Sequence, residues 1–182
     1  MEAPVSRLSI SIHPDDHIQG ERTAPCSLVE YGDYECPSCG HFQPVLRKIQ
    51  KHFGKRLLFA FRNFPLIESH AWAETAAETA EYASAHGKFW EMHDLLFANQ
   101  EQFSGPLLLE LADQLGLSKS GLSLALDEKT YRSRVRTDFD SGIRSGVNGT
   151  PTLFLDEQRY DGSLSFDSIV QGINQALMAS KV

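Results

Sequence analysis

Two cysteines, Cys36 and Cys39, stand three positions apart in the sequence Cys-Pro-Ser-Cys. A short apolar run at residues 26–31 precedes them and favours a strand. Pro37 suits the first position of a helix, because its missing N–H costs nothing there. Thiols at this spacing can close a disulfide within one helical turn. The pattern therefore predicts thiol–disulfide exchange.

The two thiols are expected to have different roles, because only one of them lies at the start of the helix. There the unpaired backbone N–H groups and the positive end of the helix dipole favour a thiolate over a thiol. Cys36 is therefore predicted to be the nucleophile, and Cys39, one turn deeper, to be the resolving thiol. The helix itself is indicated by apolar residues at helical spacing: Phe42, Val45, Leu46, Ile49 and Phe53.

A zinc site is the main alternative use of such a pair. A four-coordinate site needs two further ligands, and Cys26 is the only other cysteine in the chain. Cys36, Cys39 and His41 with one distant partner also fit, as does a pair of structural thiols. A strand before the pair, a proline inside it and a helix after it favour redox use. No metal and no bound cofactor are expected.

Further strands are predicted near the start of the chain and after residue 151, and a helix is predicted at the end of the chain. A strand at 152–155, a turn at 156–157 and a second strand at 158–160 form a hairpin, and an edge strand is expected near residues 8–12. Ser165 is predicted to cap a final helix that runs to residue 178.

The region between residues 69 and 145 is predicted to be helical. Ser69 is expected to cap the first helix, in which an alanine stripe faces a neighbouring helix while Glu74, Glu78 and Glu81 point elsewhere. The stripe consists of Ala73, Ala76, Ala77 and Ala80. Further helices are predicted at 88–98, from Pro106 to a stop at Gly116, at 118–126, and at about 127–145.

Composition limits the classes of partner. The chain has 182 residues, 41% of them hydrophobic, which is enough to bury a core without disulfides as staples. Its net charge of -7 argues against nucleic acid as a partner. No stretch approaches the roughly 20 apolar residues of a membrane span, so no membrane insertion is expected. We expect a monomer.

The first residues contain no basic and then apolar signal segment. A cytoplasmic location is therefore expected for the chain as written. A protein from which a leader has been removed would look the same, so a periplasmic or exported location stays open.

Four segments resemble the DsbA-like branch of the thioredoxin superfamily, in the order typical of that family. They are LVEYGDYECPSCG at 28–40, FRNFPL at 61–66, GKFWEMHDLLF at 87–97 and GVNGTPT at 146–152. The resemblance implies an α/β, thioredoxin-like fold with an inserted helical domain. Residues 1–64 and 146–182 would form the thioredoxin-like domain, and residues 65–145 the inserted domain.

The resemblance also implies further site residues. Pro151, preceded by Thr150, matches a proline that adopts a cis peptide bond beside the disulfide. Pro37, Ser38, Thr150 and Pro151 would contact the substrate.

Glu30 stands six residues before Cys36, inside the apolar strand, where a buried carboxyl is costly unless it has a function or a partner. The resemblance places an acidic residue here, beneath the cysteines, where it would accept the proton of Cys39.

The residue before the second cysteine bears on the strength of the oxidant. Strongly oxidising relatives have a histidine there that stabilises the thiolate, whereas this chain has Ser38. Cys36 is therefore expected to be moderately acidic, and the couple less oxidising than the extreme of the class.

Together these features predict a DsbA-like thiol–disulfide oxidoreductase. Its substrates would be protein thiols and disulfides or glutathione, with an unidentified redox partner, and a mixed disulfide would form on Cys36. Two alternatives use the same fold. One is a binding or chaperone module without redox activity. The other is a glutathione-dependent transferase or isomerase, although such enzymes usually carry serine at the position of Cys36.

Overall fold

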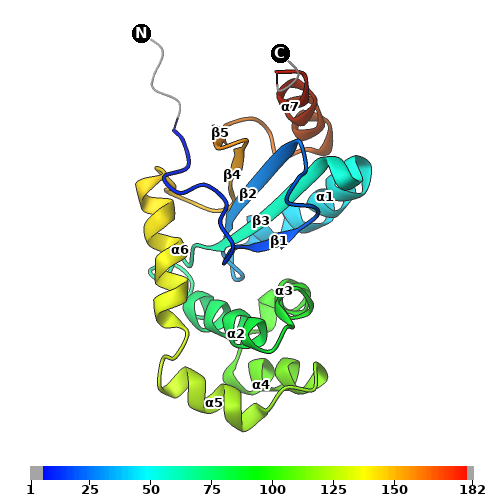
Figure 1. The fold of residues 1–182 in the computed structure, drawn as a ribbon. Coiled ribbons are helices and arrows are strands. Elements are labelled where there is room, and N and C mark those ends of the chain that lie inside the picture. Colours follow the sequence, from blue (N-terminus) through cyan, green and yellow to red (C-terminus); the bar gives the residue numbers. More distant parts are fainter. Residues whose placement is uncertain (1–5, 180–182) are drawn as a thin grey trace.

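The computed structural model describes residues 6–179, and within that range the strands form one five-stranded sheet (Figure 1). β2 and β3 run parallel in its centre, and the other neighbouring pairs are antiparallel. In the order in which they lie in the sheet, the strands are β1 (His17–Gln19), β3 (Leu57–Asn63), β2 (Cys26–Gly32), β4 (Thr152–Leu155) and β5 (Gln158–Tyr160). The predicted hairpin at 152–160 is confirmed.

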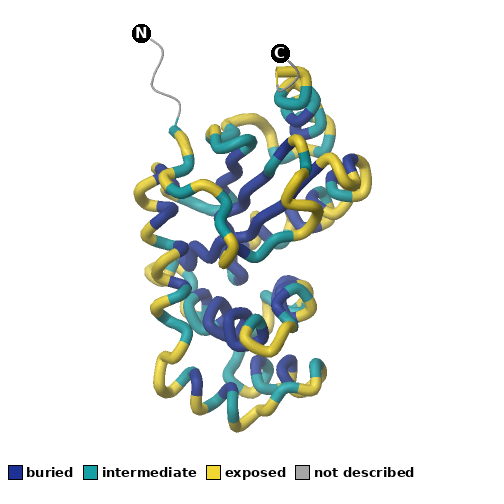
Figure 2. Tube along the Cα trace, viewed as in Figure 1, coloured by how far each residue is buried: buried dark blue, intermediate teal, exposed yellow. Residues whose placement is uncertain are grey.

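Two helices cover one face of the sheet. α1 (Pro37–Phe53) follows β2, a short 3-10 turn (Gly54–Arg56) leads from it into β3, and α7 (Phe166–Ala179) packs against α1, β2 and β4. On the other face, Val29 and Tyr31 of β2 join a second apolar cluster with the chain before β1 and with α6 (Arg132–Arg144). With both faces covered, β2 and β3 are buried along almost their whole length, as the dark blue strands of Figure 2 show.

Five helices lie between β3 and β4. In Figure 1, α2 to α5 gather below the sheet, and α6 runs back up beside it and contacts β3. Besides α6, they are α2 (Ala73–Ala85), α3 (Phe89–Ala98), α4 (Gly105–Gln114) and α5 (Lys119–Asp127), with a 3-10 turn at Gln100–Gln102. None of the helices in the described part of the chain is long and apolar enough to cross a membrane.

We keep the division into a thioredoxin-like domain (1–64 and 146–182) and an inserted helical domain (65–145) as a proposal. The position of α2 to α5 below the sheet supports it (Figure 1). Residues 1–5 and 180–182 lie outside the described part of the chain.

The predicted edge strand at 8–12 is wrong. Residues 8–12 form no strand: an isolated bridge to Gln158 is made by Arg7, just before this segment, and the edge strand is β1, a few residues later. The reason is that the carbonyl groups of Ile10 and Ser11 accept hydrogen bonds from the Arg62 side chain, at 3.0 and 3.1 Å, instead of pairing with a strand.

Two details of the helical region also differ from the predictions. Ser69 caps no helix: its N–H bonds to the carbonyl of Leu66 in a turn, and α2 begins at Ala73 without a side-chain cap. The last helix of the region begins at Arg132 instead of 127, after a turn in which Lys129 has a positive φ of 55°.

Arg62 anchors the chain before β1 to the centre of the sheet. Its guanidinium is buried on β3, and all of its N–H donors are used. Two go to the Asp16 carboxylate, at 2.9 and 2.8 Å, and one goes to the Tyr31 hydroxyl at 2.9 Å. Burial alone would raise the pKa of Asp16, but the hydrogen bonds and the charge of Arg62 hold it below its usual value.

Asp16→Asn is expected to lower the free energy of unfolding at pH 7 by about 3 kcal/mol, because it leaves a buried guanidinium without its counter-charge. The stability difference between the parent and the variant is complete above the unfolded-state pKa of Asp16, about 3.9. It is lost as pH falls through the lower folded-state pKa of Asp16. Urea unfolding at pH 7 and pH 3 measures both effects. Asp15→Asn, at an exposed neighbouring position, is the control and should change little.

Candidate active site

Cys36 forms the N-cap of α1, directly before Pro37. Its backbone N–H donates to the carbonyl of Asp33 at 3.2 Å, and its Sγ lies 3.4 Å from the carbonyl oxygen of Thr150. The side chain is buried except for a small exposed part, since 7% of the residue is accessible. Only a small part of Cys36 is therefore open to a substrate sulfur.

The environment of Cys36 favours its thiolate. A hydrogen bond from the Cys39 thiol, partly opposed by burial, lowers the pKa of Cys36 to about 5, with further help from Thr150 and from the backbone N–H groups of Cys39 and Ser38. Within residues 6–179 the buried Thr150 hydroxyl has no hydrogen-bond partner, so it is available to donate to the thiolate. Cys36 is thus ionised at neutral pH.

The other two cysteines are poor nucleophiles, because both are buried and have raised pKa values. Cys39 is completely buried, and burial together with its hydrogen bond to Cys36 raises its pKa well above the usual value. Cys26 is buried at the start of β2, and burial beside Asp156 raises its pKa to about 12. All three are free thiols in this structure. A single helical turn therefore carries a thiolate at Cys36 and a buried, protonated thiol at Cys39.

Glu30 lies on β2, opposite Phe61 of β3 and Leu153 of β4. It is completely buried, and neither carboxyl oxygen has a hydrogen-bond partner among the described residues. Burial raises its pKa to about 8, opposed by Gln43 and reinforced by the charge of Cys36. A carboxyl with this pKa exchanges its proton near neutral pH.

Gly32 is required beside this carboxyl. A Cβ at this position would lie 2.4 Å from the ring of Phe61 and 3.2 Å from Oε1 of Glu30. Any side chain would therefore displace one of these two groups from beneath the cysteines.

The segment before the cysteines is held by Asp33, a residue that the sequence analysis missed. Its buried carboxylate accepts hydrogen bonds from the backbone N–H groups of Glu35 and Leu66, at 2.8 and 2.9 Å, and lies 2.7 Å from Nδ1 of His70. Burial alone would lower the pKa of His70, but the hydrogen bond and charge of Asp33 raise it. This ion pair joins the loop after β3 to the turn that presents Cys36.

The remaining predicted residues lie around Cys36. The Thr150–Pro151 peptide bond is cis, which confirms that prediction, and it precedes β4. Pro37 and Ser38 are exposed at the start of α1. The catalytic and substrate-binding roles of all these residues stay predictions.

The zinc alternative gains no ligand set from the structure. Among residues 6–179, no group of three or more His, Cys, Asp or Glu side chains is arranged to hold a metal ion. His41 is exposed on α1, whereas Cys39 is completely buried.

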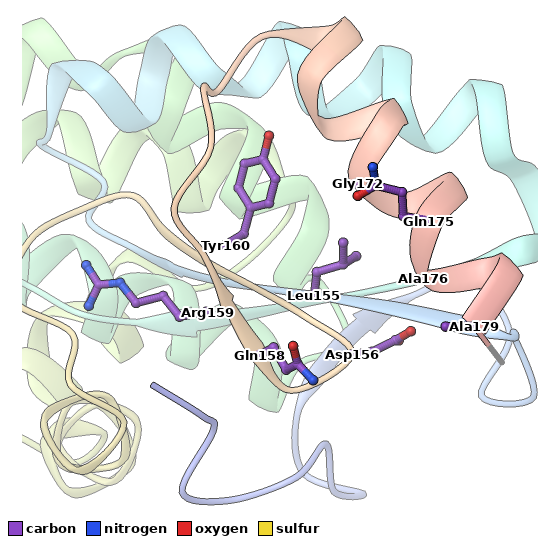
Figure 3. A pocket seen from close by; sticks show the side chains of 9 residues that line it. All are labelled: Leu155, Asp156, Gln158, Arg159, Tyr160, Gly172, Gln175, Ala176 and Ala179. Atoms are coloured by element: carbon purple, nitrogen blue, oxygen red, sulfur yellow. The ribbon is translucent and has the colours of Figure 1, made fainter. Parts of the chain in front are cut away.

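A cavity of about 530 Å³ lies away from the cysteines. It lies between the β4–β5 hairpin and α7, where Leu155 and Tyr160 face Gly172 and Gln175 (Figure 3). No residue of the cysteine site lines it, so it has no part in the chemistry of Cys36.

Comparison with known proteins gives consistent matches over most of the chain. A family model described as thioredoxin matches residues 13–175. The crystal structure of oxidised BdbD from Bacillus subtilis superimposes with a TM-score of 0.85 at 28% sequence identity, covering 96% of this chain and 97% of that one. Wolbachia pipientis alpha-DsbA1 shares the fold, with a TM-score of 0.80 at 18% identity over 93% of this chain and 94% of that one.

A relative of another kind matches in sequence. A protein from Salinispora arenicola named Na(+)/H(+) antiporter NhaA 1 is 36% identical over 176 residues, which make up 96% of this chain. The chain spans only 27% of the length of that protein.

Titration of the thiolate absorbance at 240 nm is expected to give a midpoint at about pH 5 in the parent, from Cys36. Cys39→Ala should move the midpoint upward, because the largest stabilising hydrogen bond is lost. Cys26→Ala is the matched control and should leave the midpoint in place. A parent midpoint near the ordinary thiol value of about 8.5 would contradict the assignment.

Proposed function

The chain belongs to the thioredoxin family, in its DsbA-like branch, and we propose that it is a thiol–disulfide oxidoreductase whose redox group is the Cys36–Cys39 pair. The observation that carries this proposal is the contrast between the two thiols. Cys36 has a pKa of about 5 at the helix N-terminus, and Cys39 is buried with a raised pKa. The antiporter function of the Salinispora relative is not carried over, because the match covers 27% of that protein.

The proposed reaction begins with attack of the Cys36 thiolate on a substrate disulfide. A bond forms between Cys36 Sγ and one substrate sulfur, and the other substrate sulfur leaves as a thiolate. Cys39 then loses its proton and attacks Cys36 Sγ, which releases the first substrate sulfur. The substrate disulfide is reduced to two thiols and the protein is oxidised to a Cys36–Cys39 disulfide. The reverse sequence oxidises a substrate dithiol.

Glu30 is the proposed base of the second step. Cys39 is shielded from water and cannot give its proton directly to solvent. The negative charge of Glu30 raises the pKa of Cys39, so the two groups interact. Because the pKa of Glu30 is about 8, a minor fraction of the group is ionised at pH 7, and this carboxylate fraction is the proposed acceptor of the Cys39 proton.

Substrate binding is proposed at the exposed edge of the site. Pro37 and Ser38 are exposed next to Cys36, and Thr150 places its carbonyl oxygen 3.4 Å from Cys36 Sγ. An extended polypeptide could pair with the backbone at Thr150 while its own sulfur reaches Cys36. Recognition through the backbone suits proteins of many sequences, so we propose protein thiols and disulfides as the substrates.

Cys39→Ser is expected to trap substrate, because Cys36 can still attack but nothing resolves the mixed disulfide. With a disulfide-containing model peptide, mass spectrometry of the non-reduced protein should show an adduct on Cys36. Cys36→Ser is the matched variant and should form none. Equal adducts on both variants would overturn the assignment of nucleophile and resolving thiol.

Glu30→Gln is expected to slow resolution of the mixed disulfide by at least 10-fold at pH 7, the lower end of what a general base contributes. Stopped-flow exchange with the model peptide measures this step. Alkylation of Cys36 by iodoacetamide should proceed near the parental rate.

Glu78→Gln, at another buried glutamate outside the cysteine site, is the control for this experiment. If resolution in Glu30→Gln matches the parent from pH 6 to 9, Glu30 is not the base.

A further inference from the structure

Three buried polar side chains form a chain of contacts beneath α1. Gln43 lies on α1 one turn after Cys39, and only 4% of it is exposed, which is unusual for a glutamine between apolar helix positions. Its Oε1 lies 3.3 Å from Nε2 of His93 on α3. The other ring nitrogen of His93, Nδ1, lies 3.0 Å from the hydroxyl of Tyr34. This series of contacts ends at Gln43, next to the active site.

The ring of His93 carries a single proton. Burial among other rings lowers the pKa of His93 to about 3, so the imidazole is neutral at pH 7. Burial likewise raises the pKa of Tyr34, so the phenol keeps its proton. The Tyr34 hydroxyl has no partner other than His93 Nδ1 among the hydrogen bonds of residues 6–179. If Nδ1 carried the ring proton, the buried O–H of Tyr34 would lack an acceptor, which is unfavourable.

The proton of His93 is therefore assigned to Nε2, and this fixes the orientation of Gln43. Nε2–H of His93 donates to Oε1 of Gln43, so the amide nitrogen of Gln43 points away from His93. That nitrogen and both carboxyl oxygens of Glu30 are buried without a hydrogen-bond partner among the described residues. Gln43 also opposes the upward shift of the Glu30 pKa, which is the effect expected of an N–H donor near that carboxyl.

We propose that Gln43 is a positioning residue for the exchange reaction: held by His93, it directs its amide N–H groups at Glu30 and favours the carboxylate form that accepts the proton of Cys39. The proposal rests on the role of Glu30 given above. The direction of the expected shift follows from the donor. An N–H donor directed at the carboxylate lowers the pKa of Glu30, so removing the donor raises that pKa further.

The test is Gln43→Met, which keeps the length and shape of the side chain but has no N–H group. The carboxyl carbon of Glu30, followed by 13C NMR, should titrate at about 8 in the parent and about one pH unit higher in the variant. The pH at which mixed-disulfide resolution reaches half its maximum should rise by the same amount. Alkylation of Cys36 should keep its midpoint at about pH 5.

Two further variants separate positioning from general packing. Gln50→Met is the control: Gln50 lines the same cavity of about 190 Å³ as Gln43 and His93, but it bonds to Gln19 at 2.6 Å, and its replacement should shift neither titration. His93→Phe keeps the ring but frees the Gln43 amide to rotate, and should shift both titrations in the direction of Gln43→Met.

An unchanged Glu30 titration in Gln43→Met would overturn the proposal, as would a shifted titration with an unshifted rate profile. Failure of the proposed function is seen separately, when Cys39→Ser traps no peptide, and failure of the Glu30 role is seen when Glu30→Gln resolves the mixed disulfide at the parental rate. In His93→Phe, an unshifted Glu30 titration would overturn the part assigned to His93.

Discussion

The stabilised thiolate of Cys36 is the interaction on which the rest of the site depends. It exists because β2 ends where α1 begins, so that the sulfur lies at a helix N-terminus within reach of N–H groups. A thiolate there needs a second thiol that stays protonated, and the helix supplies it by carrying Cys39 into the core. The same turn of helix therefore carries both thiols of the proposed redox couple.

Ser38 offers only a weak hydrogen bond to this thiolate, and the structure shows which groups stabilise it instead. The Cys39 thiol contributes most, followed by Thr150 and the backbone N–H groups of Cys39 and Ser38. Two of these contributions come from Cys39. The Cys39 thiol therefore stabilises the thiolate of the reduced form and is lost when the two cysteines form a disulfide. Because a more stable thiolate makes a stronger oxidant, the strength of the couple depends on both cysteines and on the residue before Pro151.

Buried charges hold the loops around this site, and each has its counter-charge or its donors. Arg62 and Asp16 fix the chain before β1, and Asp33 and His70 fix the loop after β3. Such pairs are costly to desolvate and contribute mainly when both partners are present. Glu30 is the exception: it is buried with no counter-charge, and its pKa is raised accordingly. That difference supports the proposal that Glu30 is a functional rather than a structural acid.

The sequence by itself determined the features that depend on neighbours along the chain. The cysteine pair at a helix start, β2, the β4–β5 hairpin and the final helix all follow from local spacing, proline and turn residues. The tertiary structure decided the rest. β3 has no counterpart among the predicted strands, because LLFAFRN is a continuous apolar run without a diagnostic period.

Asp33 with His70, and Gln43 with His93, were also missed. Each pair joins residues more than 30 positions apart, and their roles depend on which donor meets which acceptor inside the core. Periodicity predicts that a residue is buried. It does not identify the partner, because that is set by the packing of elements that are distant in the chain.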